Sequence, residues 1–283
     1  MERYVKACPV GCQSQLLPST IVMPEGALLE CSECGQLVSQ VSSERYWSTM
    51  RAFDEPGYSQ LAGRESERRA QVAKRRLDRV ARLLGRSPHS IRLLDIGCSR
   101  GHFLAAAVAA GYDAEGLEPA SRIVAVARAA GLRVSEGTLD QVRFPDSSFD
   151  ALTMFEVIEH VNDAVALLLE CRRILKPRGI LCLSTGNARS WTVAAMGPRW
   201  DYFQIEQDAG HISFFNPRSV RALAARTGFE VEAIVTSRVK LAERSELSGL
   251  AYRGLKVVSE LLNLPARLAG RGHDMLVYLR SGG

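Results

Sequence analysis

The chain has 283 residues, of which 46% are hydrophobic and 24% are charged, with a formal net charge of +5. This is the composition of an ordinary globular protein, and the length allows one full α/β domain with a small appendage. The first residues carry charge without an apolar segment, and no run of about eighteen uncharged apolar residues follows, so we expect neither a secretory leader nor a membrane span. We therefore expect a cytoplasmic protein without a membrane partner.

Four of the seven cysteines lie close together near the start of the sequence. Cys8 and Cys12 form one pair, and Cys31 and Cys34 form a second pair. Two thiolate pairs at this spacing are typical of a tetrahedral zinc site with four cysteine ligands, and such a site has no open coordination position. The sequence therefore predicts a structural Zn²⁺, which would supply folding energy that a short segment cannot obtain from a core. The alternative is a set of free buried thiols.

We interpret residues 1–45 as a zinc-ribbon-like module, with a hairpin over residues 16–29 between the two cysteine pairs. Residues 46–90 are predicted to be a helical linker. Between residues 64 and 86 there are nine Arg or Lys and three Asp or Glu, whereas apolar residues from Ala70 to Leu84 recur at helical spacing. We interpret the charged side as a solvated face, and the alternative is a surface that binds nucleic-acid phosphates or an acidic carrier protein.

From about residue 91 the sequence alternates short apolar segments with helical patterns. The predicted strands are residues 91–96, 114–117, 151–155 and 180–184, and the predicted helices are residues 101–110, 119–130 and 162–175. Repeated right-handed crossovers of this kind build a parallel sheet with helices on both faces. Because ligands of such sheets bind at the carboxyl ends of the strands, we expect an α/β fold with its site at the end of the first strand.

A glycine-containing turn follows that first strand. Residues 93–104 are LLDIGCSRGHFL, in which Gly97 and Gly101 permit close approach of the backbone to a ligand. Exposed amides at the start of the next helix can hold polar ligand atoms. About twenty residues later, Glu118 ends the second strand, where a carboxylate can accept hydrogen bonds from both hydroxyls of a ribose. The two features together predict a nucleotide-like ligand.

This combination resembles the class I S-adenosylmethionine-dependent methyltransferases, whose first motif is D-x-G-x-G-x-G and whose second strand ends in an acidic residue. Ser99 stands where the family has its middle glycine. A dinucleotide dehydrogenase would have G-x-G-x-x-G, which Gly97 and Gly101 do not supply. The resemblance implies S-adenosylmethionine as cofactor, bound by Asp95, Gly97, Cys98, Ser99, Gly101, Glu118, Pro119, Thr138, Leu139 and Phe155.

The resemblance also implies a fold and its boundaries. It implies a Rossmann-like sheet of seven strands, mostly parallel with the last antiparallel, over residues 91–283, together with the zinc ribbon and helical insertions. Residues 229–236 and 275–279 would form the final antiparallel pair. Residues 185–215 are predicted to form a lid whose aromatic residues either favour a flat or apolar acceptor or only attach the lid to the domain. Residues 237–273 are predicted to form a helical cap that shapes the pocket, forms a homodimer contact or touches a carrier protein.

A second group of metal-ligating residue types follows the fourth strand. Glu156, Glu159 and His160 have the spacing that brings side chains to one side of a helical turn, and His211 comes from a later loop. Such a set suits a divalent cation such as Mg²⁺. The spacing E-x-x-E-H with a later histidine resembles the metal site of ubiquinone-pathway O-methyltransferases and of small-RNA 3′-terminal 2′-O-methyltransferases, which implies a cation that holds the acceptor oxygens.

Without a cation, the same residues would organise the pocket, and His160 would be the general base. Glu156 and His211 are the other catalytic candidates. These features predict an enzyme that moves a methyl group from S-adenosylmethionine to a hydroxyl oxygen of a small molecule or sugar. The alternatives are methylation of carbon or nitrogen, an RNA methyltransferase that uses the ribbon and the basic helix, and a non-catalytic scaffold that binds S-adenosylmethionine.

Overall fold

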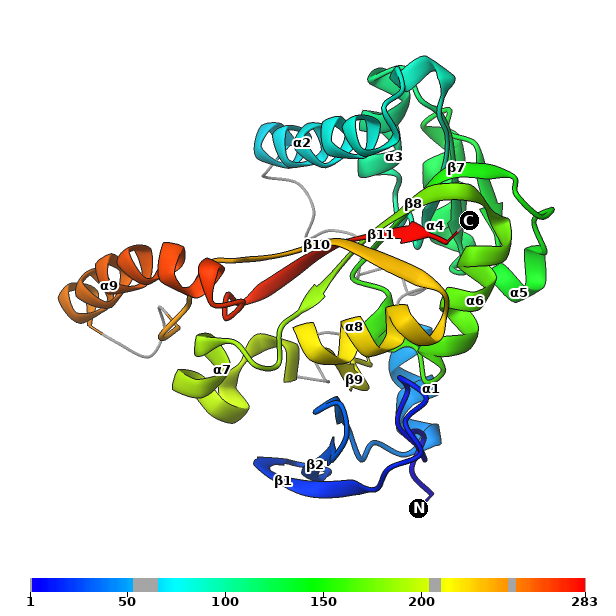
Figure 1. Ribbon diagram of the computed structural model, residues 1–283. Coiled ribbons are helices and arrows are strands. Elements are labelled where there is room, and N and C mark those ends of the chain that lie inside the picture. The colour runs from blue at the N-terminus through cyan, green and yellow to red at the C-terminus, as the bar shows by residue number, and fades with distance from the viewer. Residues whose placement is uncertain (1, 53–65, 204–209, 244–247, 283) are drawn as a thin grey trace.

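The computed structural model describes residues 2–52, 66–203, 210–243 and 248–282, and its centre is a seven-stranded sheet (Figure 1). The strands are β4 (Arg92–Ile96), β5 (Asp113–Glu118), β6 (Val134–Glu136), β7 (Phe149–Phe155), β8 (Leu175–Gly186), β10 (Phe229–Ser237) and β11 (Asp274–Ser281). Their order is β10-β11-β8-β7-β4-β5-β6. Strand β11 is antiparallel to both of its neighbours and the other neighbouring pairs are parallel. The expected Rossmann-like methyltransferase sheet is therefore confirmed, including its antiparallel last strand.

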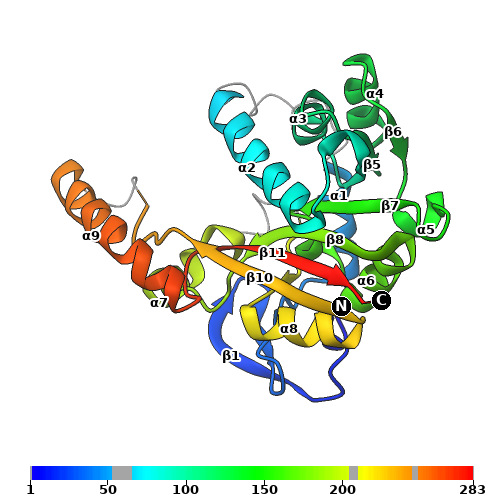
Figure 2. The same ribbon diagram turned by 45° about the horizontal axis from the view of Figure 1, so that its top comes forward.

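Helices cover both faces of the sheet (Figures 1 and 2). One face carries α2 (Ser66–Leu84), α3 (His102–Ala109) and α4 (Ser121–Ala129), and the other carries α5 (Leu139–Val142), α6 (Ala164–Ile174) and α8 (Pro217–Arg226). Successive side chains of a strand point to opposite faces. Accordingly, Leu93 packs in the apolar cluster of α2 and α3, whereas Leu94 packs in that of α6 and α8. The largely apolar central strands thus become a sheet that is buried on both sides.

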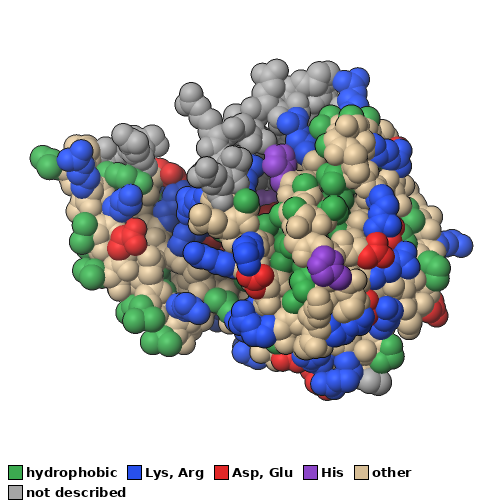
Figure 3. Space-filling model, turned by 90° about the horizontal axis from the view of Figure 1, so that it is seen from above, with side chains coloured by type: hydrophobic (Ala, Val, Ile, Leu, Met, Phe, Trp, Pro, Cys, Tyr) green, Lys and Arg blue, Asp and Glu red, His purple; other side chains and the backbone are tan. Residues whose placement is uncertain are grey.

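The basic helix α2 is amphipathic, as its spacing predicts. Leu77 and Val80 are buried against the sheet, whereas Lys74 and Arg75 are exposed. Figure 3, which views the molecule from above, shows Lys and Arg side chains spread widely over this face. Arg64, the first residue of the predicted basic stripe, lies outside the described residues.

The N-terminal segment forms a second, smaller sheet. Its strands are β1 (Leu16–Met23), β2 (Gly26–Cys31) and β3 (Leu37–Val38), followed by α1 (Ser43–Ala52). The expected hairpin is present as the antiparallel pair β1 and β2. The fourth strand of this sheet, β9 (Ser213–Phe214), comes from the methyltransferase part of the chain. The cysteine-rich segment is therefore joined to the rest of the protein through backbone pairing.

The two insertions contain further helices. The predicted lid includes α7 (Trp191–Met196) and two short turns, η4 (Gly197–Arg199) and η5 (Asp201–Phe203), and the cap contains α9 (Gly249–Leu268). Figures 1 and 2 show α9 extending away from the sheet, and its exposed side chains include Leu250, Leu261 and Leu268. The role of the cap stays a prediction, and residues 204–209 of the lid and 244–247 of the cap lie outside the described residues. None of the described helices has both the length and the apolar character that crossing a bilayer requires.

Asp150 ties three elements together at the start of β7. Its carboxylate is 3% exposed and accepts hydrogen bonds from the Arg92 amide at 2.9 Å, from Lys176 Nζ at 3.0 Å and from the Arg86 guanidinium. Burial would raise the pKa of Asp150, but these donors outweigh it and hold the pKa below its ordinary value. The carboxylate thus links the end of α2 to the starts of β4 and β8.

Replacing Asp150 with Asn should lower the free energy of unfolding by about 1–3 kcal/mol, because two cations lose their buried counter-charge. Since the folded pKa is depressed, this stabilisation is present above the unfolded carboxyl pKa of about 4 and is lost as the pH falls through the folded value. The control Asp113→Asn removes an exposed pair with Arg133 and should cost less than about 1 kcal/mol. Urea unfolding measures both, and equal losses would contradict the assignment.

Candidate functional site

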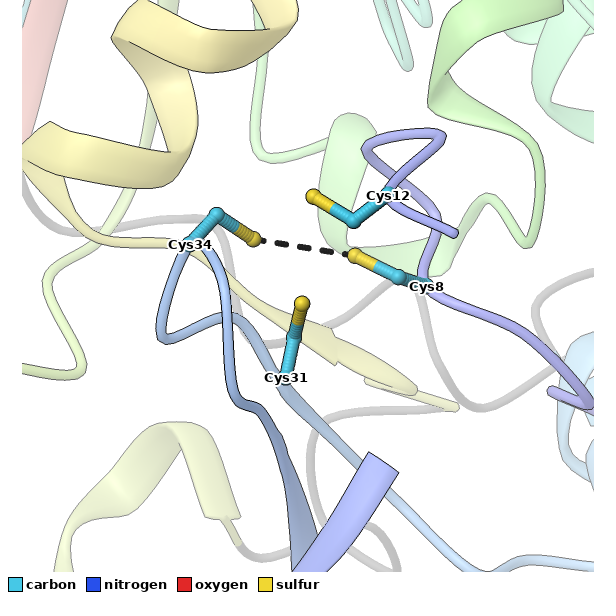
Figure 4. Close-up of side chains that lie close together, drawn as sticks. All are labelled: Cys8, Cys12, Cys31 and Cys34. Atoms are coloured by element: carbon cyan, nitrogen blue, oxygen red, sulfur yellow. Dashed lines mark hydrogen bonds between the residues drawn. The ribbon is translucent and has the colours of Figure 1, made fainter. Parts of the chain in front are cut away.

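Four sulfur atoms converge in the N-terminal segment (Figure 4). The Sγ atoms of Cys8, Cys12, Cys31 and Cys34 all lie within 4.8 Å of one another, and all four side chains are buried. The hydrogen bond from the Cys34 thiol lowers the pKa of Cys8 to about 5. Four converging sulfurs with a stabilised thiolate are the donor set of a tetrahedral zinc site. The cluster therefore fits the zinc module that the sequence predicts.

The turn after β4 is built around three residues with left-handed backbone. Gly97, Ser99 and Gly101 have φ angles of +68°, +49° and +80°. A Cβ atom at Gly97 would collide with Val157, so only glycine fits there. Ser99 adopts the left-handed conformation at the position of the family's middle glycine, where glycine would adopt it without steric cost.

Glu118 lies at the tip of β5 and faces this turn. One carboxylate oxygen accepts a hydrogen bond from the Ser99 amide at 3.0 Å, and the other accepts one from the Ala120 amide at 3.1 Å. The exposed Pro119 follows directly. Because β4 and β5 are parallel neighbours, their carboxyl ends meet at one edge of the sheet. The structure therefore brings together the two features that the sequence separates by about twenty residues.

Asp95 and Cys98 lie in the interior next to this turn. Asp95 is 3% exposed and accepts a hydrogen bond from Thr153 Oγ1 at 2.7 Å. Burial raises the pKa of Asp95 to about 7 and that of the Cys98 thiol above its ordinary range. A Cβ atom at Gly116 would lie 2.6 Å from Cys98 Sγ, so the thiol fills the space beside the neighbouring strand. The buried side chains of Asp95 and Cys98 therefore support the turn from the interior of the protein.

The other predicted cofactor residues follow β6 and β7. Thr138 is the exposed N-cap of α5, in a capping box with Gln141, and Leu139 is buried. Phe155 ends β7, where its ring centroid lies 4.7 Å from that of Phe103 and the Arg76 guanidinium lies over it at 4.3 Å. Thr138, Phe155 and the turn residues therefore lie at the carboxyl ends of β4 to β7, whereas Asp95, Cys98 and Leu139 are buried there.

A second cluster forms beside the end of β7. Ligand atoms of Glu159, His160 and His211 lie within 4.8 Å of one another, and the two imidazole centroids are 4.7 Å apart. Glu159 is fully buried, and neither of its carboxylate oxygens has a hydrogen-bond partner among the described residues. Burial, and then the charge of Glu156, raise the pKa of Glu159 well above its ordinary value.

This cluster fits a divalent cation. A buried carboxylate without a donor costs several kcal/mol unless it is protonated or bound to a metal. The adjacent imidazoles of His160 and His211 complete a set of one oxygen and two nitrogen ligands. Imidazoles with a carboxylate suit transition metals better than Mg²⁺, which prefers oxygen ligands alone.

Glu156 does not lie in this three-residue group. The expectation was a single helical turn carrying all three residues of the E-x-x-E-H segment, but Glu156 has left-handed backbone with a φ of +56°. A short 3-10 turn, η3 (Ile158–His160), then carries the other two residues. The Glu156 carboxylate instead accepts hydrogen bonds from Ser184 Oγ at 2.6 Å and from the Tyr202 hydroxyl. Glu156 therefore lies outside the three-residue ligand group, although its charge still acts on Glu159.

Two tyrosines of the site were not among the residues predicted from the sequence. The Tyr202 ring stacks on His211 with a centroid distance of 5.2 Å, and its carbonyl oxygen lies 3.0 Å from His211 Nδ1. Tyr46 donates a hydrogen bond from its hydroxyl to the His160 carbonyl at 2.8 Å. The aromatic composition of the lid was a signal for Tyr202. No local pattern indicates Tyr46, because its partner is 114 positions away along the chain.

Comparison with known families is consistent with this geometry. The model of a family described as a methyltransferase domain matches residues 65–234, which is more than half of the chain. The chain belongs to this methyltransferase family. It is an S-adenosylmethionine-dependent methyltransferase, as the donor turn and the sheet order indicate. The cysteine-rich module, α9 and β11 lie outside the matched residues.

The similar curated proteins include ubiquinone biosynthesis O-methyltransferases. The one from Xanthomonas oryzae pv. oryzae is 29% identical over 178 residues, which cover 57% of this chain and 74% of that protein. The one from Cereibacter sphaeroides is 36% identical over 118 residues, which cover 39% of this chain and 48% of that protein.

Solved structures share the fold. A SAM-dependent methyltransferase from Archaeoglobus fulgidus aligns with a TM-score of 0.53 and 18% identity, covering 74% of this chain and 94% of that chain. The [4+2]-cyclase SpnF aligns with a TM-score of 0.50 and 23% identity, covering 79% of this chain and 85% of that chain. Because a fold can host several chemistries, the acceptor must be inferred from the site.

Proposed function

We propose that this enzyme methylates a hydroxyl oxygen of a small-molecule acceptor beside the cluster of Glu159, His160 and His211. One observation carries the proposal: the donor turn packs against Val157, in the segment that leads into this cluster. Gly97 has no room for a Cβ because Val157 packs against it, and Val157 is two residues before Glu159. The donor turn and the segment that carries the cluster are therefore neighbours, and holding two reacting groups in alignment can remove about 7–11 kcal/mol of a reaction barrier.

On the donor side, the residues of this chain bind and orient. Bound S-adenosylmethionine supplies a methyl group on a sulfonium, which is an excellent leaving group. Glu118 is held at the turn, where it is placed to accept hydrogen bonds from ribose hydroxyls. Thr138 and Leu139 contribute the adenine side, and Gly97 and Gly101 allow the backbone to approach the ligand.

On the acceptor side, Glu159, His160 and His211 would hold a divalent cation. A bound cation supplies Lewis acidity, which lowers the pKa of a hydroxyl group. The buried carboxylate of Glu159, which has no hydrogen-bond partner among the described residues and lies 4.0 Å from His211 Nε2, supports this role. Where no cation binds, His160 is the candidate general base, and the Tyr202 stacking on His211 keeps the imidazole pair in place.

Three further observations support a small, flat or apolar acceptor. The relatives are named O-methyltransferases of ubiquinone biosynthesis. Tyr202, a partly buried residue, stacks on His211 and places an aromatic ring beside the cluster. Arg76 and Arg79 of the basic helix lie over aromatic rings, so part of the basic stripe serves packing and not RNA binding. The four-cysteine module would hold a structural Zn²⁺ with no part in the chemistry.

Replacing Glu118 with Ala should weaken binding of S-adenosylmethionine by about tenfold to a hundredfold, because hydrogen bonds to a charged group are lost. The matched control is Glu115→Ala on the same strand, where the carboxylate pairs with Arg92 away from the turn. Isothermal calorimetry measures both affinities. An unchanged affinity in the Glu118 variant would remove the donor site from this edge of the sheet.

The cation affinity should rise with pH. Because the pKa of Glu159 is raised, cation binding must displace a proton, and the affinity should increase with pH until the pH exceeds the raised pKa. Binding of Mn²⁺, followed by electron paramagnetic resonance of the free ion, should be lost in Glu159→Gln and retained in Glu136→Gln, a change at the exposed tip of β6. A pH-independent affinity, or full binding in Glu159→Gln, speaks against the cation.

The acceptor can be found by mass spectrometry of extracts from cells that lack the protein, where the product should be replaced by a species lighter by one CH₂ group. Adding the purified enzyme with deuterated-methyl S-adenosylmethionine should restore the heavier species with an O-linked label. Label on carbon, nitrogen or RNA would replace the proposal by the corresponding alternative. Cofactor binding without any transfer would indicate a scaffold.

A further inference from the structure

The cysteine module and the acceptor-side cluster share a sheet. Strand β3, three residues after Cys34, pairs antiparallel with β9 in the register Leu37 to Phe214 and Val38 to Ser213. Strand β9 begins two residues after His211. The knuckle that holds two of the four sulfurs therefore sets the position of a backbone segment that leads directly from a residue of the cluster.

Ile212 connects the two sides through its own peptide groups. Its carbonyl accepts a hydrogen bond from the Ser39 amide at 2.9 Å, and its amide donates to the Glu159 carbonyl at 2.9 Å. Ile212 is fully buried, so these peptide groups have no water to replace lost partners. A shift of β3 would thus move Ile212, and with it both His211 and the backbone of Glu159.

The third residue of the cluster is held by the helix that follows the module. The Tyr46 hydroxyl of α1 donates to the His160 carbonyl at 2.8 Å, and the Tyr46 ring stacks on Tyr4 at a centroid distance of 4.0 Å. Tyr4 is tied to the module because its amide donates to the Val41 carbonyl. Each residue of the cluster therefore has a backbone connection to residues 4–46.

The cysteine knuckle is itself anchored in the methyltransferase core. The buried Asn216 donates from Nδ2 to the Gly35 carbonyl at 2.7 Å while its Oδ1 caps α8. Glu33 pairs with Arg226 of the same helix. The four cysteines also belong to the apolar cluster that contains Phe215 and Leu223. The module consequently has one fixed position relative to the sheet.

We propose that the four-cysteine module is a positioning device for the acceptor side of the active site: its metal-held knuckle sets β3, which sets β9 and Ile212, while Tyr46 sets His160. Residues Tyr46 and Ser39 are positioning residues that act through the cluster. The proposal rests on the proposed function for the role of Glu159, His160 and His211, but its tests depend on neither transfer activity nor the identity of the acceptor.

Amide hydrogen exchange on the full chain tests the connection. The zinc-loaded protein is compared with the Cys31→Ser, Cys34→Ser double variant, with metal content measured by mass spectrometry. Exchange at the Ser39 and Ile212 amides should become at least about tenfold faster in the variant, since each loses the restraint on its hydrogen bond. Exchange at the Gly116 amide, which bonds the Arg133 carbonyl across the far strands, should stay the same, and the affinity for S-adenosylmethionine should change by less than about threefold.

The pattern of exchange decides between a positioning device and an appendage. Acceleration at Ser39 with an unchanged Ile212 would show that the module loosens alone and would overturn the proposal. The proposal would also be overturned if a variant without metal exchanged all three amides at the same rates as the zinc-loaded protein. If exchange at the Gly116 amide also becomes faster, the double variant is globally unfolded. The Tyr46→Phe variant then tests the proposal.

Tyr46→Phe removes one hydroxyl and keeps the stacked ring. The ring resonances of His160 in the NMR spectrum should shift, and those of His102 should not. The matched control is Tyr112→Phe, because Tyr112 is also 5% exposed and donates to a backbone carbonyl, that of Leu77, at 2.7 Å on another part of the domain. Unmoved His160 resonances in Tyr46→Phe, or equal shifts in both variants, would contradict the positioning role.

Discussion

The parallel pairing of β4 with β5 on one side and β7 on the other is the constraint on which the site depends. Ile96 at the end of β4 is in register with Leu117 and Met154, so the residues that follow these strands emerge at one edge of the sheet. The left-handed turn at Gly97, the carboxylate of Glu118 and the loop that begins at Glu156 are neighbours for this reason alone. The buried side chains beneath the edge keep the strands in this register, because a shift by one residue would reverse which face each side chain meets.

The two clusters of metal-ligating residues differ in the number of their ligands and in how their polar atoms are satisfied. The four cysteines are a closed set, buried in an apolar cluster and held by turns on both sides, which suits an ion that never meets substrate. Glu159, His160 and His211 are a smaller set whose central carboxylate lacks a hydrogen-bond donor among the described residues. Such a group is costly in the folded protein, and groups of this kind concentrate where function requires them. Between the two clusters lies a continuous run of backbone hydrogen bonds through β3 and β9.

Prediction from sequence was successful where the information is local. The order of strands and helices follows from runs such as residues 92–96. The antiparallel pair of β10 and β11 was expected, with nearly its observed bounds, from the resemblance to the methyltransferase family. The glycine turn, Glu118 and the cysteine pairs could be identified because turn chemistry and ligand spacing involve neighbouring residues. The position of Glu156 differed from the one expected, because its own left-handed backbone interrupts the helical spacing on which the expectation relied.

The sequence by itself determined the fold class and the candidate donors of both clusters, because each depends on periodicity or spacing within a few tens of residues, and its resemblance to the class I methyltransferases implied the cofactor. Only the tertiary structure decided how these parts are joined: that β9 completes the sheet of the cysteine module, that Tyr46 bonds the carbonyl of His160, and that Tyr202 occupies the carboxylate of Glu156. The residues that these contacts join are separated by 46 to more than 170 positions along the chain. No periodicity records such pairs, since they arise when separate elements pack and their polar backbone groups must find partners.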